Sequence, residues 1–233
     1  MLRIFIDPKR SKITHERSIF IKLQSLPCTK NMEANPTLLC IPDISGFTRF
    51  MGEIDFELSA KVIPSLLNNI VYSNEIDLKI SEIEGDAVLF FRVGRLPTLR
   101  ALVDQCKHFY TEFYKQMDIL RKKNNGHEAA RKIPEMLGLK IILHFGAEIG
   151  LVPIGKNIKL MGEDVIVAHR LMKNEIPIDE YILITEDLLA NFHDVEKTDL
   201  LEWADMNSGA INVDHLGKVN FRYIDLRPLQ PKM

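Results

Sequence analysis

The chain has 233 residues, of which 46% are hydrophobic, and a formal net charge of −2 at pH 7. This length suits one large domain, or one domain with an appendage, and the apolar content is enough to bury a substantial core, which argues against a disordered chain. Residues 1–31 carry seven Lys and Arg against two acids, a balance of +5, so the remainder holds about −7, which argues against nucleic acid as a partner but is compatible with a nucleotide bound through metal ions.

The first segment, residues 1–31, shows no regular hydrophobic period and is interpreted as a basic irregular N-terminal extension. Residues 32–233 are expected to form one domain. Met32 stands at this boundary and is an alternative start of the protein, a question that the sequence leaves open.

From Thr37 onward, short apolar runs typical of strands alternate with segments whose apolar residues recur at helical spacing. A short apolar run ends at a polar, glycine-containing turn, and apolar residues then recur at helical spacing, interrupted by Pro64, which predicts a kink or a break. Two further apolar runs flank Gly85-Asp86 and predict a hairpin. The expected elements of this half are strand 37–42, helix 56–71, and strands 78–84 and 87–93.

The second half continues the alternation. It contains a long amphipathic stripe, a charged connection, the most hydrophobic strand candidate of the chain and a closing strand. The expected elements are helix 99–120, connection 121–132, strands 139–145 and 148–154, turn 155–157, helix 163–172, strand 181–185, helix 186–192 and strand 219–226. The pattern predicts an α+β sheet with helices packed on one face, not a fully parallel doubly wound sheet.

The cysteines and the hydropathy indicate the compartment. Cys28, Cys40 and Cys106 share no metal-ligand or redox spacing, which favours reduced, mostly packed thiols. No apolar run approaches the ~20 residues of a membrane-spanning helix. We therefore expect a cytoplasmic protein without a membrane partner.

Two carboxylates stand where strands are expected to end. Asp43 follows a buried strand, and the next residues can point backbone N–H groups at phosphate oxygens; the alternative is an Asx turn that ends the strand. Asp86 lies in the turn of the predicted hairpin, where Gly-Asp is common for structural reasons alone. Together, two such carboxylates on neighbouring strands are suited to two Mg²⁺ or Mn²⁺ ions in a phosphoryl transfer.

A third candidate is Arg170, in the helix that follows Gly162. A guanidinium can neutralise charge that develops on a phosphoryl group. The alternative is a surface ion pair of little consequence. The histidines show no paired ligand spacing, so packed or solvated roles are favoured for them.

Five segments, in this order, resemble motifs of the class III adenylyl/guanylyl cyclase family. The first is similar to the Asp-Ile-x-Gly-Phe-Thr opening of that family, and the others to its Gly-Asp hairpin, its Ile-His-x-Gly strand, the helix that carries its arginine, and its closing Lys-Gly turn. They are residues 43–48, 84–88, 143–146 with Gly150, 161–171 and 216–218. The resemblance runs from about residue 37 to residue 226, and the hairpin is closest to an uncharacterised bacterial branch.

The resemblance implies a ferredoxin-like class III cyclase fold with a central, mostly antiparallel sheet. It implies that Asp43 and Asp86, with the carbonyl of Ile44, bind two Mg²⁺ or Mn²⁺ ions. Backbone N–H groups would hold the triphosphate, and Arg170 would act across a homodimer interface as the ribose 3′-hydroxyl attacks the α-phosphorus, leaving a 3′,5′-cyclic nucleotide and pyrophosphate. The implied phosphate-binding residues are Gly46, Phe47 and Thr48, with Lys218 as a weaker candidate.

Two positions, Ile166 and Lys159, depart from the family pattern. The asparagine expected one turn before the arginine is Ile166, which cannot form a hydrogen bond with a ribose. Glu82 matches the glutamate of guanine-selective members, but its companion position is Lys159, which matches neither the adenine nor the guanine type. The base of the substrate stays open.

The function hypotheses are therefore three. The first is a homodimeric nucleotidyl cyclase. The alternative is a catalytically degenerate cyclase-like module that binds a nucleotide or a partner, and the third is a purely structural dimer.

Overall fold

The computed structural model describes residues 34–155, 157–193 and 204–231. The described residues from Ala34 onward belong to one compact unit. The predicted N-terminal extension, residues 1–31, lies outside the described residues, as do Met32 and Cys28.

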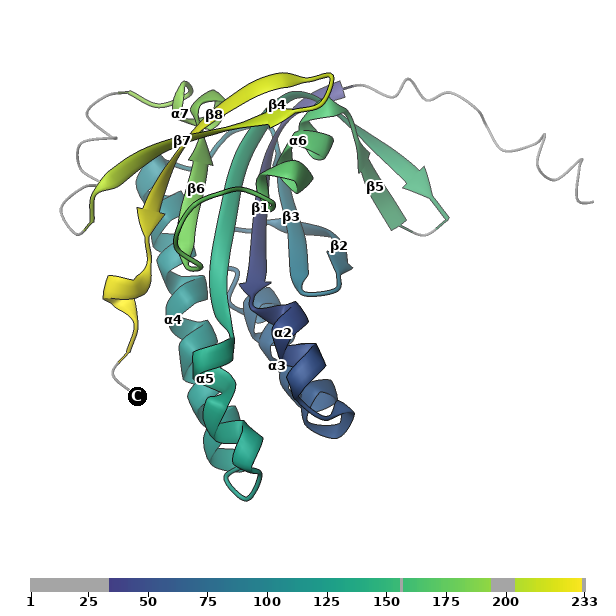
Figure 1. Cartoon of the computed structure of the whole chain (residues 1–233). Coiled ribbons are helices and arrows are strands. Elements are labelled where there is room, and N and C mark those ends of the chain that lie inside the picture. The colour runs from purple at the N-terminus through teal and green to yellow at the C-terminus, as the bar shows by residue number, and fades with distance from the viewer. Residues whose placement is uncertain (1–33, 156, 194–203, 232–233) are drawn as a thin grey trace, which may run out of the picture. The chain divides into compact units, whose positions relative to one another are not determined.

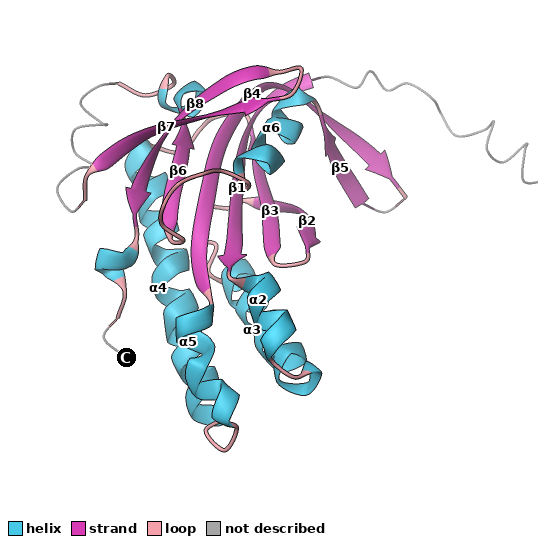
Figure 2. Cartoon of the chain, viewed as in Figure 1, coloured by secondary structure: helices cyan, strands magenta, loops and turns pink. Residues whose placement is uncertain are grey.

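Within the described residues, eight strands form one sheet (Figures 1 and 2). Seven of them follow the order β2-β3-β1-β4-β6-β8-β7, and β5 pairs with β4 outside this path. Only the β4–β6 pair is parallel, so the prediction of an α+β fold with a mostly antiparallel sheet is confirmed. The strands are β1 (Ala34–Ser45), β2 (Lys79–Glu84), β3 (Ala87–Val93), β4 (Gly138–Ile154), β5 (Asn157–Met161), β6 (Tyr181–Thr185), β7 (Met206–Val213) and β8 (Gly217–Asp225).

Helices cover both faces of the sheet, which corrects the prediction that they pack on one face. Side chains of a strand point alternately to its two faces, and β1 supplies Leu38 and Cys40 to one core and Leu39 and Ile41 to the other. The first core is closed by most of the helices, whereas α6 closes the second (Figure 1). The helices are α2 (Phe47–Glu53), α3 (Phe56–Tyr72), α4 (Leu99–Lys123), α5 (Ile133–Met136), α6 (Glu163–Leu171), α7 (Glu186–Leu189) and the 3-10 helices η1 (Glu128–Lys132) and η2 (Arg227–Leu229).

Pro64 was predicted to kink or break its helix. α3 continues through Pro64, so the helix is not broken there. Proline removes one helical N–H and leaves the carbonyl four residues earlier without its partner. Both Pro64 and Ala60 are exposed, so water can bind that carbonyl at little cost.

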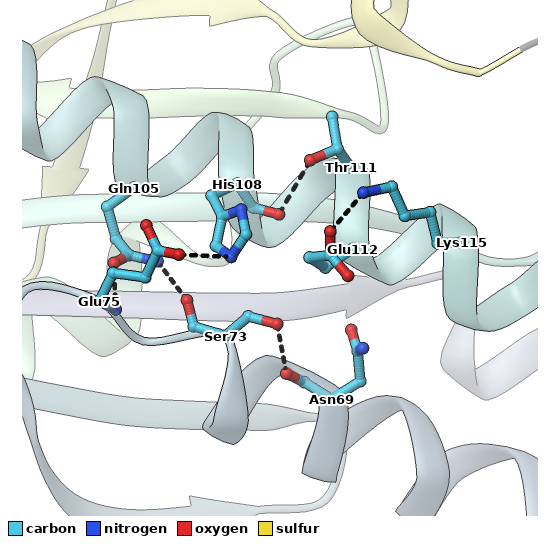
Figure 3. Close-up of polar contacts among 8 residues, drawn as sticks. All are labelled: Asn69, Ser73, Glu75, Gln105, His108, Thr111, Glu112 and Lys115. Atoms are coloured by element: carbon cyan, nitrogen blue, oxygen red, sulfur yellow. Dashed lines mark hydrogen bonds and ion pairs between the residues drawn. The ribbon is translucent and has the colours of Figure 1, made fainter.

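The buried amide of Gln105 ties the end of α3 to α4 (Figure 3). Its Nε2 donates to the carbonyl oxygen of Ser73 at 2.7 Å, and its Oε1 accepts from the backbone N–H of Glu75 at 2.7 Å. Both ends of the amide are thus satisfied, as a buried polar group requires. The free thiols of Cys40 and Cys106 are buried, as predicted.

Other differences from the prediction concern strands and connections. The prediction did not include α2, β5 or β7, and it divided the continuous strand β4 into two. The expected connection 121–132 contains the end of α4 and η1. None of the helices in the described part of the chain combines the length and apolar character that crossing a membrane requires.

Gly46 joins β1 to α2 and is expected to tolerate no side chain. Its φ is +80°, and a Cβ there would lie 1.9 Å from the carbonyl oxygen of Met136. Gly46→Ala is therefore expected to lower the free energy of unfolding by more than about 2 kcal/mol, measured by urea denaturation. The matched control is Gly52→Ala in α2, where a Cβ meets nothing within 4 Å and helix propensity predicts a gain of about 0.5–1 kcal/mol. Equal effects at the two positions would contradict this account of the junction.

Candidate active site

The register of three strands brings Asp43 and Asp86 together. Asp43 lies near the end of β1 opposite Ala87 of β3, so the turn between β2 and β3 places Asp86 beside it. The backbone N–H of Ile44 donates to the carbonyl oxygen of Asp86 at 3.0 Å and fixes this turn against β1. Asp43 is only 7% exposed, and Asp86 is partly buried.

The surroundings of Asp86 oppose its ionisation. Burial and the charge of Asp43 raise the pKa of Asp86 to about 6, and the nearby Lys140 offsets part of this rise. Like charges held together in a partly desolvated place disfavour the ionised form. A bound cation would relieve that cost, so the pair is chemically suited to hard divalent ions.

Lys140 is a member of this cluster that the sequence analysis missed. It stands directly opposite Asp43 in the register of β1 and β4, and its Nζ lies 3.2 Å from Asp43 Oδ2. The same Nζ donates to the carbonyl oxygen of Met172, at the end of α6, at 3.0 Å. No motif marked Lys140, since only the strand register reveals its place.

A cavity of about 320 Å³ opens beside the carboxylates. One part of its wall comes from β1 and from the β2–β3 hairpin, another from Lys140 and the end of α6. Of the predicted site residues, the lining includes Asp43, Thr48, Glu82 and Asp86; it further includes Ile41, Glu84, Ala87, Leu89, Lys140, His169, Met172 and Lys173. From the sequence, His169 was expected to be packed or solvated, and no motif marked Lys173.

Glu82 and Lys159, predicted from different segments, form an ion pair between β2 and β5. Lys159 Nζ also lies 3.8 Å from Glu84. Burial alone would raise the pKa of Glu82, but hydrogen bonding with Lys159 and Glu84 and the charge of Lys159 hold it below its usual value. The pair presents a donor and an acceptor side by side.

Other predicted residues lie away from this cavity. Gly46 lines a second cavity of about 320 Å³, next to α5 and η2. Lys218 lines a third, of about 250 Å³, together with the buried His144 and Asp164, whose Nε2 and Oδ1 are 3.3 Å apart. Arg170 is exposed on α6 and lines none of these three.

The two remaining predicted residues flank the end of β1. Ile44 has a buried side chain, and Phe47 is partly buried against the first core. Among the described residues, no group of three or more His, Cys, Asp or Glu side chains is arranged to hold a metal ion. The two carboxylates would therefore need further oxygen ligands, from the backbone or from a ligand.

Sequence comparisons connect the chain to uncharacterised proteins. A family model described as "Protein of unknown function (DUF2652)" matches residues 63–181, about half of the chain, a segment that includes Asp86 and Arg170 but not Asp43. The chain is 28% identical over 109 residues to the "Uncharacterized protein Rv2561/Rv2562" of Mycobacterium tuberculosis. The match covers 47% of this chain and 50% of that relative, so the chain spans about half of the relative's length.

Comparison with solved structures gives the fold. The chain is similar to the adenylyl cyclase CyaB from P. aeruginosa, with a TM-score of 0.58 and 19% identity, over 82% of this chain and 94% of that one. It is similar to a bacterial light-regulated adenylyl cyclase, with a TM-score of 0.56 and 14% identity, over 99% and 70% of the two chains. A third is the catalytic core of a rhodopsin-guanylyl cyclase with converted specificity in complex with ATPαS, with a TM-score of 0.55 and 14% identity, over 82% and 96%. The expected class III cyclase fold is confirmed.

The raised pKa of Asp86 predicts a pH-dependent cost of folding without metal. The folded protein holds this proton up to pH of about 6, whereas the unfolded chain releases it near 3.8, so stability falls as pH rises through that window. Asp86→Asn removes the charge and is expected to stabilise the protein in EDTA by about 1 kcal/mol at pH 7.5, after allowance for partial exposure, and by less at pH 5. Thermal unfolding at the two pH values measures it, with the exposed Glu175→Gln as control. A gain that is the same at both pH values would contradict the coupling of Asp43 and Asp86.

Proposed function

We propose that this chain, which belongs to the DUF2652 family of proteins of unknown function, is a metal-dependent nucleotidyl cyclase that converts a nucleoside triphosphate into a 3′,5′-cyclic nucleotide and pyrophosphate at a homodimer interface. The observation that carries the proposal is the carboxylate pair Asp43 and Asp86, which lines a cavity of about 320 Å³ and in which burial and the charge of Asp43 raise the pKa of Asp86. The likeness of the fold to cyclase catalytic domains is consistent with it.

Asp43 and Asp86, with the carbonyl of Ile44, are proposed to hold two Mg²⁺ or Mn²⁺ ions. Such ions, when bound, neutralise phosphate charge and lower the pKa of a coordinated hydroxyl. Lys140 is proposed to exchange its contact with Asp43 for the phosphates once cations occupy the pair, because an ammonium and a divalent ion compete for the same oxygens.

The triphosphate is proposed to lie at the junction of β1 and α2. Gly46 has the left-handed conformation that turns the chain from strand to helix, and it is followed by Phe47 and Thr48 at the free N–H end of α2. Backbone N–H groups at such an end attract anions. Thr48 lines the same cavity as the carboxylates.

The second protomer is proposed to complete the site. Arg170 is exposed and does not line the cavity of its own chain, so it would serve the site of the other copy, together with Lys218. Two apolar side chains near Arg170 are exposed and available for burial at an interface with a second copy. Ile166 in α6 is 52% exposed, and Met161 at the end of β5 is 53% exposed. A transition-state guanidinium supplied in trans is a known arrangement in phosphoryl transfer.

The base is proposed to contact Glu82 and Lys159. A purine carries both hydrogen-bond donors and acceptors on its Watson–Crick edge, and the Glu82–Lys159 pair offers the complementary acceptor and donor. Both adenine and guanine can satisfy such a pair, so the assay below includes every common nucleotide.

A degenerate, nucleotide-binding module is the second candidate, and Ile166 is the observation that favours it. Its exposed side chain replaces the amide that would hold a ribose, and misplaced reacting groups cost rate even when binding survives.

Purified protein is expected to form a cyclic product from at least one of the four common nucleoside triphosphates in the presence of Mn²⁺, as read by mass spectrometry. Asp43→Asn and Asp86→Asn are each expected to lower the rate at least about a hundredfold, because each removes a ligand of the metal ions. The absence of product from all four nucleotides, while the protein is folded and dimeric, would end the enzyme proposal.

The same assay tests whether Arg170 acts in the site of the other protomer. Asp43→Asn and Arg170→Ala protomers are each inactive alone on this account, but an equal mixture contains heterodimers with one intact site and should recover about a quarter of the wild-type rate. A mixture that stays inactive, although subunits exchange, would place Arg170 in the site of its own chain.

Ile166→Asn is expected to raise the rate of cyclisation by about tenfold, because an amide at this position can orient the ribose. The measurement is the initial rate under saturating nucleotide. Ile119→Asn, on the exposed surface of α4 (55% exposed), is the matched control and should leave the rate unchanged. An active wild-type enzyme that loses activity with Ile166→Asn would show that the alignment of α6 is wrong.

A further inference from the structure

The end of α6 places two basic side chains in the wall of the carboxylate cavity. His169, in the last turn, and Lys173, just beyond the helix, both line this cavity. In the described part of the chain, neither side chain makes an ion pair or a hydrogen bond at contact distance, although an electrostatic interaction with His169 helps to lower the pKa of Glu82. Because neither side chain is held by a hydrogen bond, both are available to a ligand.

The other charged residues of this cavity already have partners or repel each other. Lys140 contacts Asp43, and Glu82 pairs with Lys159, which reaches in from β5. Within the described residues, Asp86 makes no ion pair with a basic side chain, and it lies beside the carboxylate of Asp43. The cavity thus has a carboxylate without a basic partner on one wall and the basic side chains of His169 and Lys173 on another.

Resting on the proposed function, we propose that His169 and Lys173 bind the phosphate chain of the nucleotide whose metal ions are held by Asp43 and Asp86 of the same chain. A metal–polyphosphate complex presents cations to carboxylates and anionic oxygens to basic groups, so it satisfies both walls at once. The favourable field at a helix C-terminus explains why cations are stable at the end of α6. It does not explain why both of them line the cavity of the carboxylates.

This assignment divides the basic residues at the end of α6 and just beyond it between two sites. His169 and Lys173 face the cavity of their own chain, whereas the neighbouring Arg170 is exposed and does not line it. His169 and Lys173 would then bind the phosphates of the nucleotide held by their own protomer. Arg170 would act on the reacting centre of the nucleotide held by the partner.

Inorganic tripolyphosphate with Mn²⁺ tests the assignment without base, ribose or turnover. Isothermal titration of the full chain is expected to show three- to tenfold weaker binding for Lys173→Gln and for His169→Gln, about the loss for one charge-assisted hydrogen bond in a partly exposed site. Lys173→Arg, which keeps the charge, should retain most of the affinity. Lys115→Gln and His108→Gln on α4, both drawn in Figure 3, are the matched controls and should bind as the wild type does.

Wild-type affinity in both variants, or no binding of tripolyphosphate by folded wild-type protein, would overturn the assignment. The result of the nucleotide assay does not depend on the result of this titration. A cyclic product with unchanged tripolyphosphate affinity in the variants would reject His169 and Lys173 and leave the cyclase proposal standing. The expected loss of affinity in a protein that cyclises no nucleotide would keep the phosphate site and reject the cyclase proposal.

Discussion

The site depends on one unfavourable contact, the proximity of the carboxylates of Asp43 and Asp86. The sheet enforces this contact: β1 and β3 pair with Asp43 opposite Ala87, and the N–H of Ile44 holds the carbonyl of Asp86 at 3.0 Å. These contacts hold the hairpin in place, and burial together with the charge of Asp43 raises the pKa of Asp86 to about 6. Strained or repulsive arrangements that the fold maintains at some cost in stability are characteristic of functional sites.

Charged side chains of both signs surround this carboxylate pair at the end of the sheet. Lys140 bridges Asp43 to the end of α6, so the metal-binding candidates and the helix that carries His169 and Arg170 are mechanically connected. Glu82 and Lys159 form a separate polar pair on the β2–β5 side. A ligand with a base, a sugar and a polyphosphate would contact chemically different walls, and this division supports a nucleotide better than a simple anion.

The local signals in the sequence predicted the parts of this site that are local in the chain. Gly85-Asp86 between two apolar runs predicted the β2–β3 hairpin, and the apolar run before Asp43 predicted β1. Lys140 had no such signal, because it joins Asp43 only through the register of β1 and β4, almost a hundred positions apart in sequence. The cavity residues His169 and Lys173 were missed for a similar reason, since no periodicity indicates which side of a helix end faces a distant strand.

Tertiary context also explains the errors in the fold. β7 (Met206–Val213) is an edge strand with mostly exposed or half-buried side chains, so it lacks the apolar pattern by which strands are recognised. The sequence shows that β1 and β4 are apolar on both sides, but it does not show which helix covers each side. All helices were expected on one face, whereas α6 covers the other. Pro64 was expected to kink or break α3. It lies on the exposed side of the helix, where water can replace the lost hydrogen bond, so the helix continues through it.

The central claim is that Asp43 and Asp86 jointly bind divalent cations. Anomalous diffraction from crystals grown with Mn²⁺ and a 3′-deoxynucleoside triphosphate, which lacks the attacking hydroxyl, tests it most directly. The account predicts manganese peaks within coordination distance of both carboxylates, with Lys140 displaced from Asp43. Ordered nucleotide without manganese at this pair, or manganese bound only elsewhere on the chain, would contradict it.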